Sequence, residues 1–206
     1  TRLHVSNIKL CSEGNCLGAL QHQTGYIDNF NLRYAAYDAK SIANAINLGA
    51  TELFGKENTK VYLLTSPGQK KPTKELIKNT FEAISKVAKP EDILIVYLSG
   101  HGITWGGDSG DFYYLTADSF SSNSSAYNDP LIREKTTIST KEFTEWIKKI
   151  PSLKQVMILD ACGSGKAVDN LVAVKNVEDN QIKAIDRMKD RTGMFIISGC
   201  TADAVS

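Results

Sequence analysis

DILIVYLSGHG, residues 92–102, is the stretch that decides the fold. It begins with a run that is apolar on both faces, which is typical of a central strand covered by helices on each side. The stretch KQVMILDACGSG, residues 154–165, repeats this design. Each strand leads into a turn with one reactive side chain, His101 in the first and Cys162 in the second. Because ligands bind at the carboxyl ends of parallel strands, we expect both side chains at one site.

The segments around these two strands alternate between helix and strand. Apolar residues three and four positions apart predict helices, and short β-rich runs between turn signals predict strands. The helices are predicted over residues 31–54, 72–89 and 139–150, and the further strands over residues 60–65, 111–117 and 194–198. We therefore expect one α/β domain over residues 1–206, with a mainly parallel central sheet and helices on both faces.

Two segments give a different signal. Residues 3–10 fit a first strand only loosely, because their apolar residues do not form a continuous run. Residues 119–128 are rich in Ser and Asn, which predicts a mobile surface loop.

The helix predicted over residues 139–150 has the clearest start. Ser139 and Glu142 have the spacing of a capping box, in which each side chain bonds the backbone of the other. Ile138 and Phe143 flank them as a hydrophobic staple would. The sequence therefore predicts that the helix begins directly after Ser139.

Charge and composition exclude several classes of partner. The 24 Lys and Arg residues against 23 Asp and Glu give a formal net charge of +1, which predicts neither nucleic acid nor a membrane as partner. The longest apolar run is too short to span a bilayer, and residues 1–10 lack the build of a signal peptide. Four scattered cysteines, Cys11, Cys16, Cys162 and Cys200, do not suit a disulfide scaffold. We expect a reducing, cytoplasmic location.

Cys11 and Cys16, together with His4 and His22, allow a second interpretation as a zinc site. However, a C-x4-C pair with loosely spaced histidines matches the usual two-residue zinc knuckles poorly. A polar surface loop with two free thiols fits the spacing better, so no metal site is predicted.

His101 and Cys162 together have the chemistry of a nucleophilic hydrolase. A thiol becomes a strong nucleophile when an imidazole takes its proton, and imidazole titrates near neutral pH. The backbone N–H groups of Gly102 and Cys162 are candidates for an oxyanion hole. Each side chain alone has an ordinary interpretation, as a small buried thiol or a surface histidine. Their equivalent positions after two apolar strands favour catalysis.

The two motifs resemble those of the caspase, metacaspase and orthocaspase group of cysteine peptidases. They are SGHG at residues 99–102 and DACGSG at residues 160–165, with 61 positions from the histidine to the cysteine. The similarity covers residues 31–206, and residues 32–39 resemble the first helix of that group. The resemblance implies a caspase–hemoglobinase fold, of which this chain is the large-subunit portion. It also implies peptide-bond hydrolysis through an acyl-enzyme on Cys162.

The resemblance also implies a substrate preference. True caspases bind an aspartate before the scissile bond and carry Gln where this chain has Asp160. Metacaspase-like relatives hold Arg or Lys with acids matching Asp38 and Asp160 and a serine matching Ser99. Asp118, at the end of its strand, is a further candidate, although an ordinary structural role is favoured for it. An acidic pocket favours a paired cation, so we expect cleavage after Arg or Lys.

The resemblance further divides the chain. Residues 30–165 form the catalytic core, residues 166–191 lie where the group has its activation loop, and most of the small-subunit region is absent. Self-cleavage or an upstream signal is the expected route of activation. Four basic residues of the loop are candidate processing sites: Lys183, Arg187, Lys189 and Arg191.

Expected partners are a protein or peptide substrate, the small-subunit segment or remaining chain of the same protein, and an activating protein. No cofactor is required, and calcium stays open as an optional ion, because no EF-hand loop is present. Two rival interpretations remain. One is a catalytically silent adaptor or binding module with the same fold, and the other is a regulated effector in defence or cell death with the same chemistry.

Overall fold

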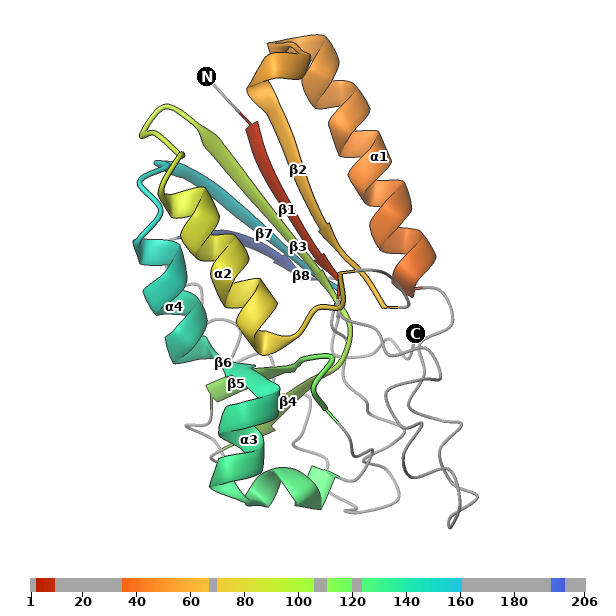
Figure 1. Ribbon diagram of the computed structural model, residues 1–206, viewed down its shortest axis with the longest axis vertical. Helices are drawn as coiled ribbons and strands as arrows, with labels where there is room; N and C mark the ends of the chain where they lie inside the picture. The colour runs from red at the N-terminus through yellow and green to blue at the C-terminus, as the bar shows by residue number, and fades with distance from the viewer. Residues whose placement is uncertain are drawn as a thin grey trace.

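The computed structural model describes residues 3–9, 35–66, 70–105, 111–119, 124–160 and 194–198. Within them, five strands form a parallel sheet in the order β2-β1-β3-β7-β8 (Figure 1). The strands are β1 (Leu3–Lys9), β2 (Thr59–Leu64), β3 (Ile93–Ser99), β7 (Lys154–Asp160) and β8 (Phe195–Ser198). The predicted mainly parallel sheet is confirmed, with the two apolar runs side by side as β3 and β7.

The amino-terminal segment is a full strand, which the sequence indicated only loosely. Residues 3–9 form β1, which pairs with β2 on one side and with β3 on the other. Polar residues such as Ser6 and Asn7 interrupt its apolar character, so no continuous run marks it as a central strand. Pairing along both edges satisfies its backbone groups, and this tertiary context outweighs the weak local signal.

Helices of the described part of the chain lie on both faces of the sheet (Figure 1). α1 (Ala35–Phe54) packs through Ala50 and neighbouring apolar residues against Ile93 and Ile95 of β3. A short 3-10 helix, η1 (Lys56–Asn58), follows α1 after Gly55, whose φ of 85° favours glycine. Helices on both faces are therefore confirmed.

The opposite face carries the main apolar core. α2 (Lys74–Ser85) and α4 (Thr140–Lys148) cover it, and their aromatic rings pack together. The ring centroid of Phe81 lies 6.3 Å from that of Phe143 and 5.9 Å from that of Trp146. The first contact is edge-to-face and the second is tilted, and aromatic contacts of both kinds add to the burial of apolar area.

Helix starts follow from their caps. The capping box of Ser139 is confirmed: its hydroxyl accepts a hydrogen bond from the N–H of Glu142, and the Glu142 carboxylate accepts one from the N–H of Ser139. α2 begins two residues later than predicted, because the Thr73 hydroxyl caps it by accepting from Leu76 N–H. Pro72 therefore precedes the helix.

A second, antiparallel sheet lies at the carboxyl end of β3 (Figure 1). It consists of β4 (Gly102–Trp105), β5 (Asp111–Leu115) and β6 (Thr137–Ser139). The strand predicted over residues 111–117 exists as β5, but it belongs to this sheet. Because β4 follows β3 after Gly100 and His101 alone, the second sheet begins at the candidate site.

The prediction of a surface loop over residues 119–128 is wrong for residues 124–128. Ser124–Asn128 forms a 3-10 helix, η3, and the side chain of Tyr127 is buried. α3 (Pro130–Thr136) follows, and its Arg133 guanidinium donates a hydrogen bond of 2.7 Å to the Tyr127 carbonyl. One buried aromatic side chain thus outweighs the polar composition around it.

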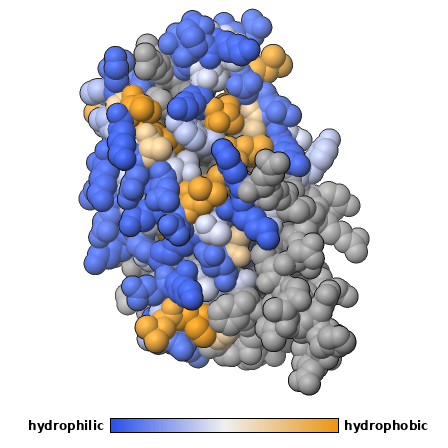
Figure 2. Space-filling model, viewed as in Figure 1, coloured by the Kyte–Doolittle hydropathy of each residue, from blue (hydrophilic) through white to orange (hydrophobic). Residues whose placement is uncertain are grey.

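The surface seen in Figure 2 is largely hydrophilic over the described elements, with small and separate hydrophobic patches. Exposed apolar side chains such as Leu48, Leu53 and Leu131 occur on different helices or turns of helix. Among the described residues, no helix combines the length and apolar character needed to cross a membrane.

Candidate active site

The candidate site begins where β3 and β7 end side by side. Ser99 and Asp160 are direct partners in the register of the two strands, and the N–H of Gly100 donates to the Asp160 carbonyl at 3.2 Å. Neighbouring strands run about 4.8 Å apart. His101 follows Ser99 by two residues and Cys162 follows Asp160 by two residues. The two predicted catalytic residues thus continue from paired positions, although Cys162 itself lies outside the described residues.

The turn that carries His101 is held by β5. The His101 carbonyl accepts a hydrogen bond of 3.0 Å from the N–H of Leu115. The buried hydroxyl of Tyr114 donates to the Ser99 carbonyl at 2.8 Å. His101 is itself only 9% exposed. Hydrogen bonds to the carbonyls of Ser99 and His101 therefore restrict the backbone that carries the imidazole, and a fixed position favours general-base chemistry.

Packing requires glycine at position 102, in addition to the predicted role of its N–H group in the oxyanion hole. A Cβ atom at this position would meet the Phe112 ring, with 2.6 Å to its Cζ atom. Real Cβ atoms do not approach so closely, so Phe112 fills the space that a larger residue would need. The close passage of β4 over this ring explains why glycine follows His101. The oxyanion role of the Gly102 and Cys162 N–H groups stays a prediction.

Three side chains form a hydrogen-bonded group on the α1 side of the strand ends. Tyr97 and Ser99 lie two residues apart on β3 and so share a face of the sheet. The Tyr97 hydroxyl lies 3.2 Å from Asp160 Oδ2, and the Ser99 hydroxyl lies 3.5 Å from the same atom. We call Tyr97, Ser99 and Asp160 the polar cluster. Its tyrosine ring is buried, whereas Asp160 is exposed.

The pKa of Tyr97 connects the polar cluster to α1. This pKa is raised from 10.0 to about 12, first by burial of the ring and then by the negative charge of Asp160. The hydrogen bond from Ser99 lowers it, whereas the hydrogen bond with Asp160 and the charge of Asp38 raise it. Asp38 lies in the first turn of α1 and is half-buried. The predicted substrate-binding residues Asp38, Ser99 and Asp160 are therefore grouped around one phenol.

Sequence reasoning missed Tyr97. It counts as one more apolar residue in a strand that is apolar throughout, so composition gave no reason to single it out. Its position two residues before Ser99 was the available signal, because alternate residues of a strand share a face. The register with β7 then brings its hydroxyl to Asp160.

Asp118 has a structural role in the described part of the chain. Its Oδ2 atom accepts a hydrogen bond of 2.7 Å from the N–H of Lys74, the first residue of α2, and another of 3.1 Å from the Thr116 hydroxyl. A carboxylate at a helix N-terminus satisfies an orphan donor and complements the helix dipole. We therefore leave Asp118 out of the proposed substrate pocket.

Several predicted residues lie outside the described part of the chain. The processing candidates are among them, and so are Cys11, Cys16 and His22 of the zinc alternative. His4 lies in β1. Among the described residues, no group of three or more His, Cys, Asp or Glu side chains is placed to hold a metal ion. Calcium as an optional ion stays a prediction.

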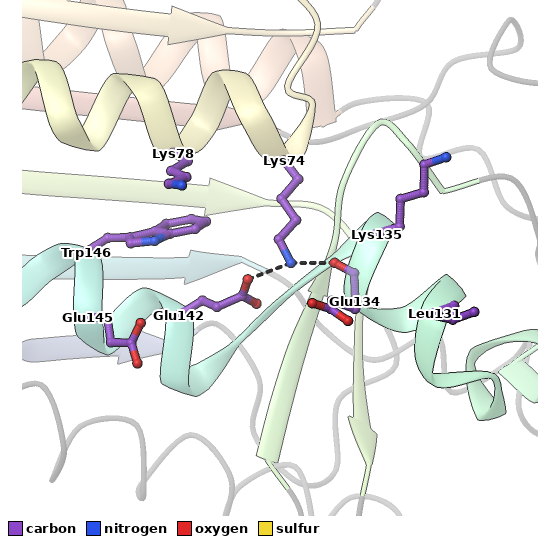
Figure 3. Close-up of a pocket in the computed structure, with 8 residues that line it drawn as sticks. All are labelled: Lys74, Lys78, Leu131, Glu134, Lys135, Glu142, Glu145 and Trp146. Atoms are coloured by element: carbon purple, nitrogen blue, oxygen red, sulfur yellow. Dashed lines mark hydrogen bonds and ion pairs between the residues drawn. The ribbon is translucent and has the colours of Figure 1, made fainter.

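A cavity of about 630 Å³ lies elsewhere, between α2, α3 and α4 (Figure 3). Lys74 reaches across it, with its Nζ atom 2.6 Å from Glu142 Oε1 and hydrogen-bonded to the Glu134 carbonyl. The lining residues are Lys74, Lys78, Leu131, Glu134, Lys135, Glu142, Glu145 and Trp146. They include no predicted site residue, and the Lys74 contacts join three helices. We interpret this cavity as a structural junction, in spite of its size.

Comparison with known proteins gives the family. Residues 23–206 match the family model described as the Caspase domain. The chain belongs to the caspase domain family. The parallel sheet with helices on both faces is the α/β caspase–hemoglobinase fold expected from the two motifs. Membership places this caspase domain in a family of cysteine peptidases.

Other comparisons add the fold alone. The caspase domain is similar to the crystal structure of protein GSU0716 from Geobacter sulfurreducens, with a TM-score of 0.56 and 14% sequence identity. The similarity covers 98% of this chain and 74% of that chain. No curated protein matches the caspase domain.

Proposed function

We propose that this protein is a cysteine endopeptidase that cleaves proteins after Arg or Lys through His101 and Cys162. The observation that carries the proposal is the pairing of Ser99 with Asp160, two residues before the histidine and the cysteine respectively. Because β3 and β7 end in direct register, the segments that carry His101 and Cys162 both begin at the same edge of the sheet. The turn that carries His101 is also fixed by hydrogen bonds from β5 to Ser99 and His101.

The proposed reaction has two halves. In the first, His101 accepts the proton of the Cys162 thiol, and the thiolate attacks the carbonyl carbon of the scissile bond. The N–H groups of Gly102 and Cys162 stabilise the oxyanion, and His101 returns the proton to the leaving amine. In the second half, water hydrolyses the thioester on Cys162 with His101 again as base.

The polar cluster supports the preference for Arg or Lys. Asp160 is exposed at the strand ends, and Asp38 is near enough for its charge to act on the same tyrosine. Two carboxylates attract a guanidinium or ammonium group, whereas they repel an aspartate side chain. Ser99 supplies a hydroxyl at the same point.

Activation follows from the same preference. A protease that cleaves after Arg or Lys can cleave its own loop at residues 166–191, where Lys183, Arg187, Lys189 and Arg191 are the candidate sites. The partners of such an enzyme are its protein substrate, the remaining segments of its own chain and an upstream activator. We place it in the cytoplasm, with calcium as an optional activator.

The test is turnover of fluorogenic peptides that differ only in having Arg, Lys, citrulline or Asp before the scissile bond. We expect cleavage after Arg and Lys, with and without calcium measured in parallel. Cys162→Ala and His101→Ala should each lower kcat by at least about 1000-fold. Cys200→Ala is the matched control for loss of a thiol and should retain activity.

Two results would contradict parts of the proposal. Cleavage after Asp, lost in Cys162→Ala, would keep the dyad and overturn the acidic pocket. Absence of Cys162-dependent cleavage with every peptide, after limited proteolysis of the loop at residues 166–191 as well as before it, would favour the catalytically silent adaptor.

A further inference from the structure

Tyr97 occupies an unusual place in β3. Its side chain is 2% exposed, in a strand whose other buried residues, apart from Ser99, are aliphatic. A Phe or Ile would fill such a position without a polar atom. The Tyr97 hydroxyl instead reaches the exposed end of the cluster, where it lies 3.2 Å from Oδ2 of Asp160. A buried ring thus presents one hydrogen-bond donor to a carboxylate at the surface.

We propose that Tyr97 is a positioning residue that orients the Asp160 carboxylate toward the cationic side chain of the substrate. This inference rests on the proposed function, because it assumes that Asp160 binds Arg or Lys. Tyr97 itself does not need to touch the substrate. It acts through the rotamer of Asp160.

The hydrogen-bond pattern at Asp160 supports this role. Both hydroxyl donors of the polar cluster, from Tyr97 and Ser99, contact the same atom, Oδ2. Within the described part of the chain, no donor contacts Oδ1 of Asp160. Tyr97, at 3.2 Å, is the closer donor, whereas Ser99 lies at 3.5 Å, so the Tyr97 hydroxyl is the main restraint on the Asp160 rotamer. A fixed carboxylate loses less side-chain entropy when it binds a planar guanidinium.

The neutral phenol is well suited to this task. A Lys or Arg donor would hold Asp160 equally well, but its charge would cancel the attraction for a cationic substrate. Tyrosine donates a hydrogen bond and leaves the negative charge in place. Because burial and the nearby acids raise the pKa of Tyr97 to about 12, the phenol stays a donor over the whole pH range of an assay.

The first experiment measures binding without turnover. Cys162→Ala protein, as the whole chain, is titrated with a peptide amide that ends in Arg and with its citrulline counterpart. Tyr97→Phe in this background should weaken binding of the Arg peptide about tenfold, the effect of one charge-assisted hydrogen bond. Binding of the citrulline peptide should change less than about twofold. Tyr62→Phe, a half-buried tyrosine of β2, is the matched control.

The second experiment separates a positioning role from a structural one. In a double-mutant cycle, Tyr97→Phe is repeated in protein that also carries Asp160→Asn. If Tyr97 acts through Asp160, its effect on the Arg peptide disappears in this background. In the active enzyme, Tyr97→Phe should raise KM for the Arg substrate with kcat nearly unchanged.

Each outcome decides the inference. Equal binding of the Arg peptide with Tyr or Phe at position 97 overturns it, as does a tenfold loss that persists without the Asp160 carboxylate. Failure of the Cys162→Ala protein to prefer Arg over citrulline also overturns it, because Asp160 then holds no cation. Failure of the proposed function is a different result: the wild-type chain binds the Arg peptide selectively and does not cleave it.

Discussion

On the side of β3 that faces α2 and α4, Leu94, Val96 and Leu98 are fully buried in an apolar core. On the side that faces α1, the same strand changes from apolar Ile95 to Tyr97 and Ser99 at its carboxyl end. The first face packs against α2 and α4 along its length, whereas the second packs against α1 and ends in the polar cluster. Because alternate side chains of a strand point to opposite faces, β3 contributes to the apolar core with one set of residues and to the proposed substrate site with the other.

Leu98→Ala gives the largest effect expected from this comparison. Its side chain is fully buried on the apolar face, so truncation loses apolar burial and leaves a cavity. We expect the free energy of unfolding to fall by about 3 kcal/mol, measured by urea denaturation. The ratio of kcat/KM for Arg and Asp peptides should not change.

Ser99→Ala is the matched variant one residue further along. It should cost less than about 1 kcal/mol of stability and lower kcat/KM for the Arg peptide several-fold. If Leu98→Ala alters the preference for Arg more than Ser99→Ala does, the division between the two faces is wrong.

The pH dependence of stability gives an intermediate effect. Because the pKa of Tyr97 is raised from 10.0 to about 12, the folded protein holds the phenolic proton more tightly than the unfolded chain does. This contribution is complete below pH 10 and is lost as the pH rises through 12. The free energy of unfolding should fall by about 1.4 kcal/mol between pH 9 and 11 on this account.

Tyr97→Phe removes this contribution, and unfolding curves of both proteins over that pH range provide the measurement. The difference between them isolates Tyr97 from the titration of lysines. Parallel curves for the two proteins would show that Tyr97 is not the buried, acid-flanked phenol described above.

Asp118→Ala is expected to have the smallest effect on substrate preference. It removes the acceptor for the Lys74 N–H at the start of α2, which should cost about 1 kcal/mol of stability. Preference for Arg over Asp should stay as in the wild type. Asp129→Ala, which removes the cap of α3, is the control, and the two variants should behave alike. A selective loss of Arg cleavage in Asp118→Ala would return this residue to the pocket.

Sequence reasoning was most reliable for the apolar face. β3 and β7 are continuous apolar runs, and the capping box at Ser139 marks the start of α4 with two residues alone. Sequence reasoning was least reliable for strands that form only because a distant segment pairs with them. β4 and β6 are four and three residues long, and their partner strand, not their composition, makes them strands.

The site divides in the same way. His101 and Cys162 were predicted from two motifs that follow two apolar runs. Asp38, Ser99 and Asp160 came from the family resemblance, and the structure groups them around Tyr97. Tyr97 could not be predicted in this role, because the register between β3 and β7 brings its hydroxyl to Asp160 and no local pattern encodes that register.

The central place of β1 has a consequence for synthesis on the ribosome. β1 lies between β2 and β3, so its two edges are completed by segments that emerge at very different times. At ordinary translation rates, roughly 5 to 20 seconds separate the emergence of β1 from that of β3. During that interval one edge of the nascent strand has no permanent partner, and it is open to chaperones or to other chains. Ser6 and Asn7, whose polarity weakens the sequence signal for β1, also make this strand less apolar and so less prone to aggregate during that interval.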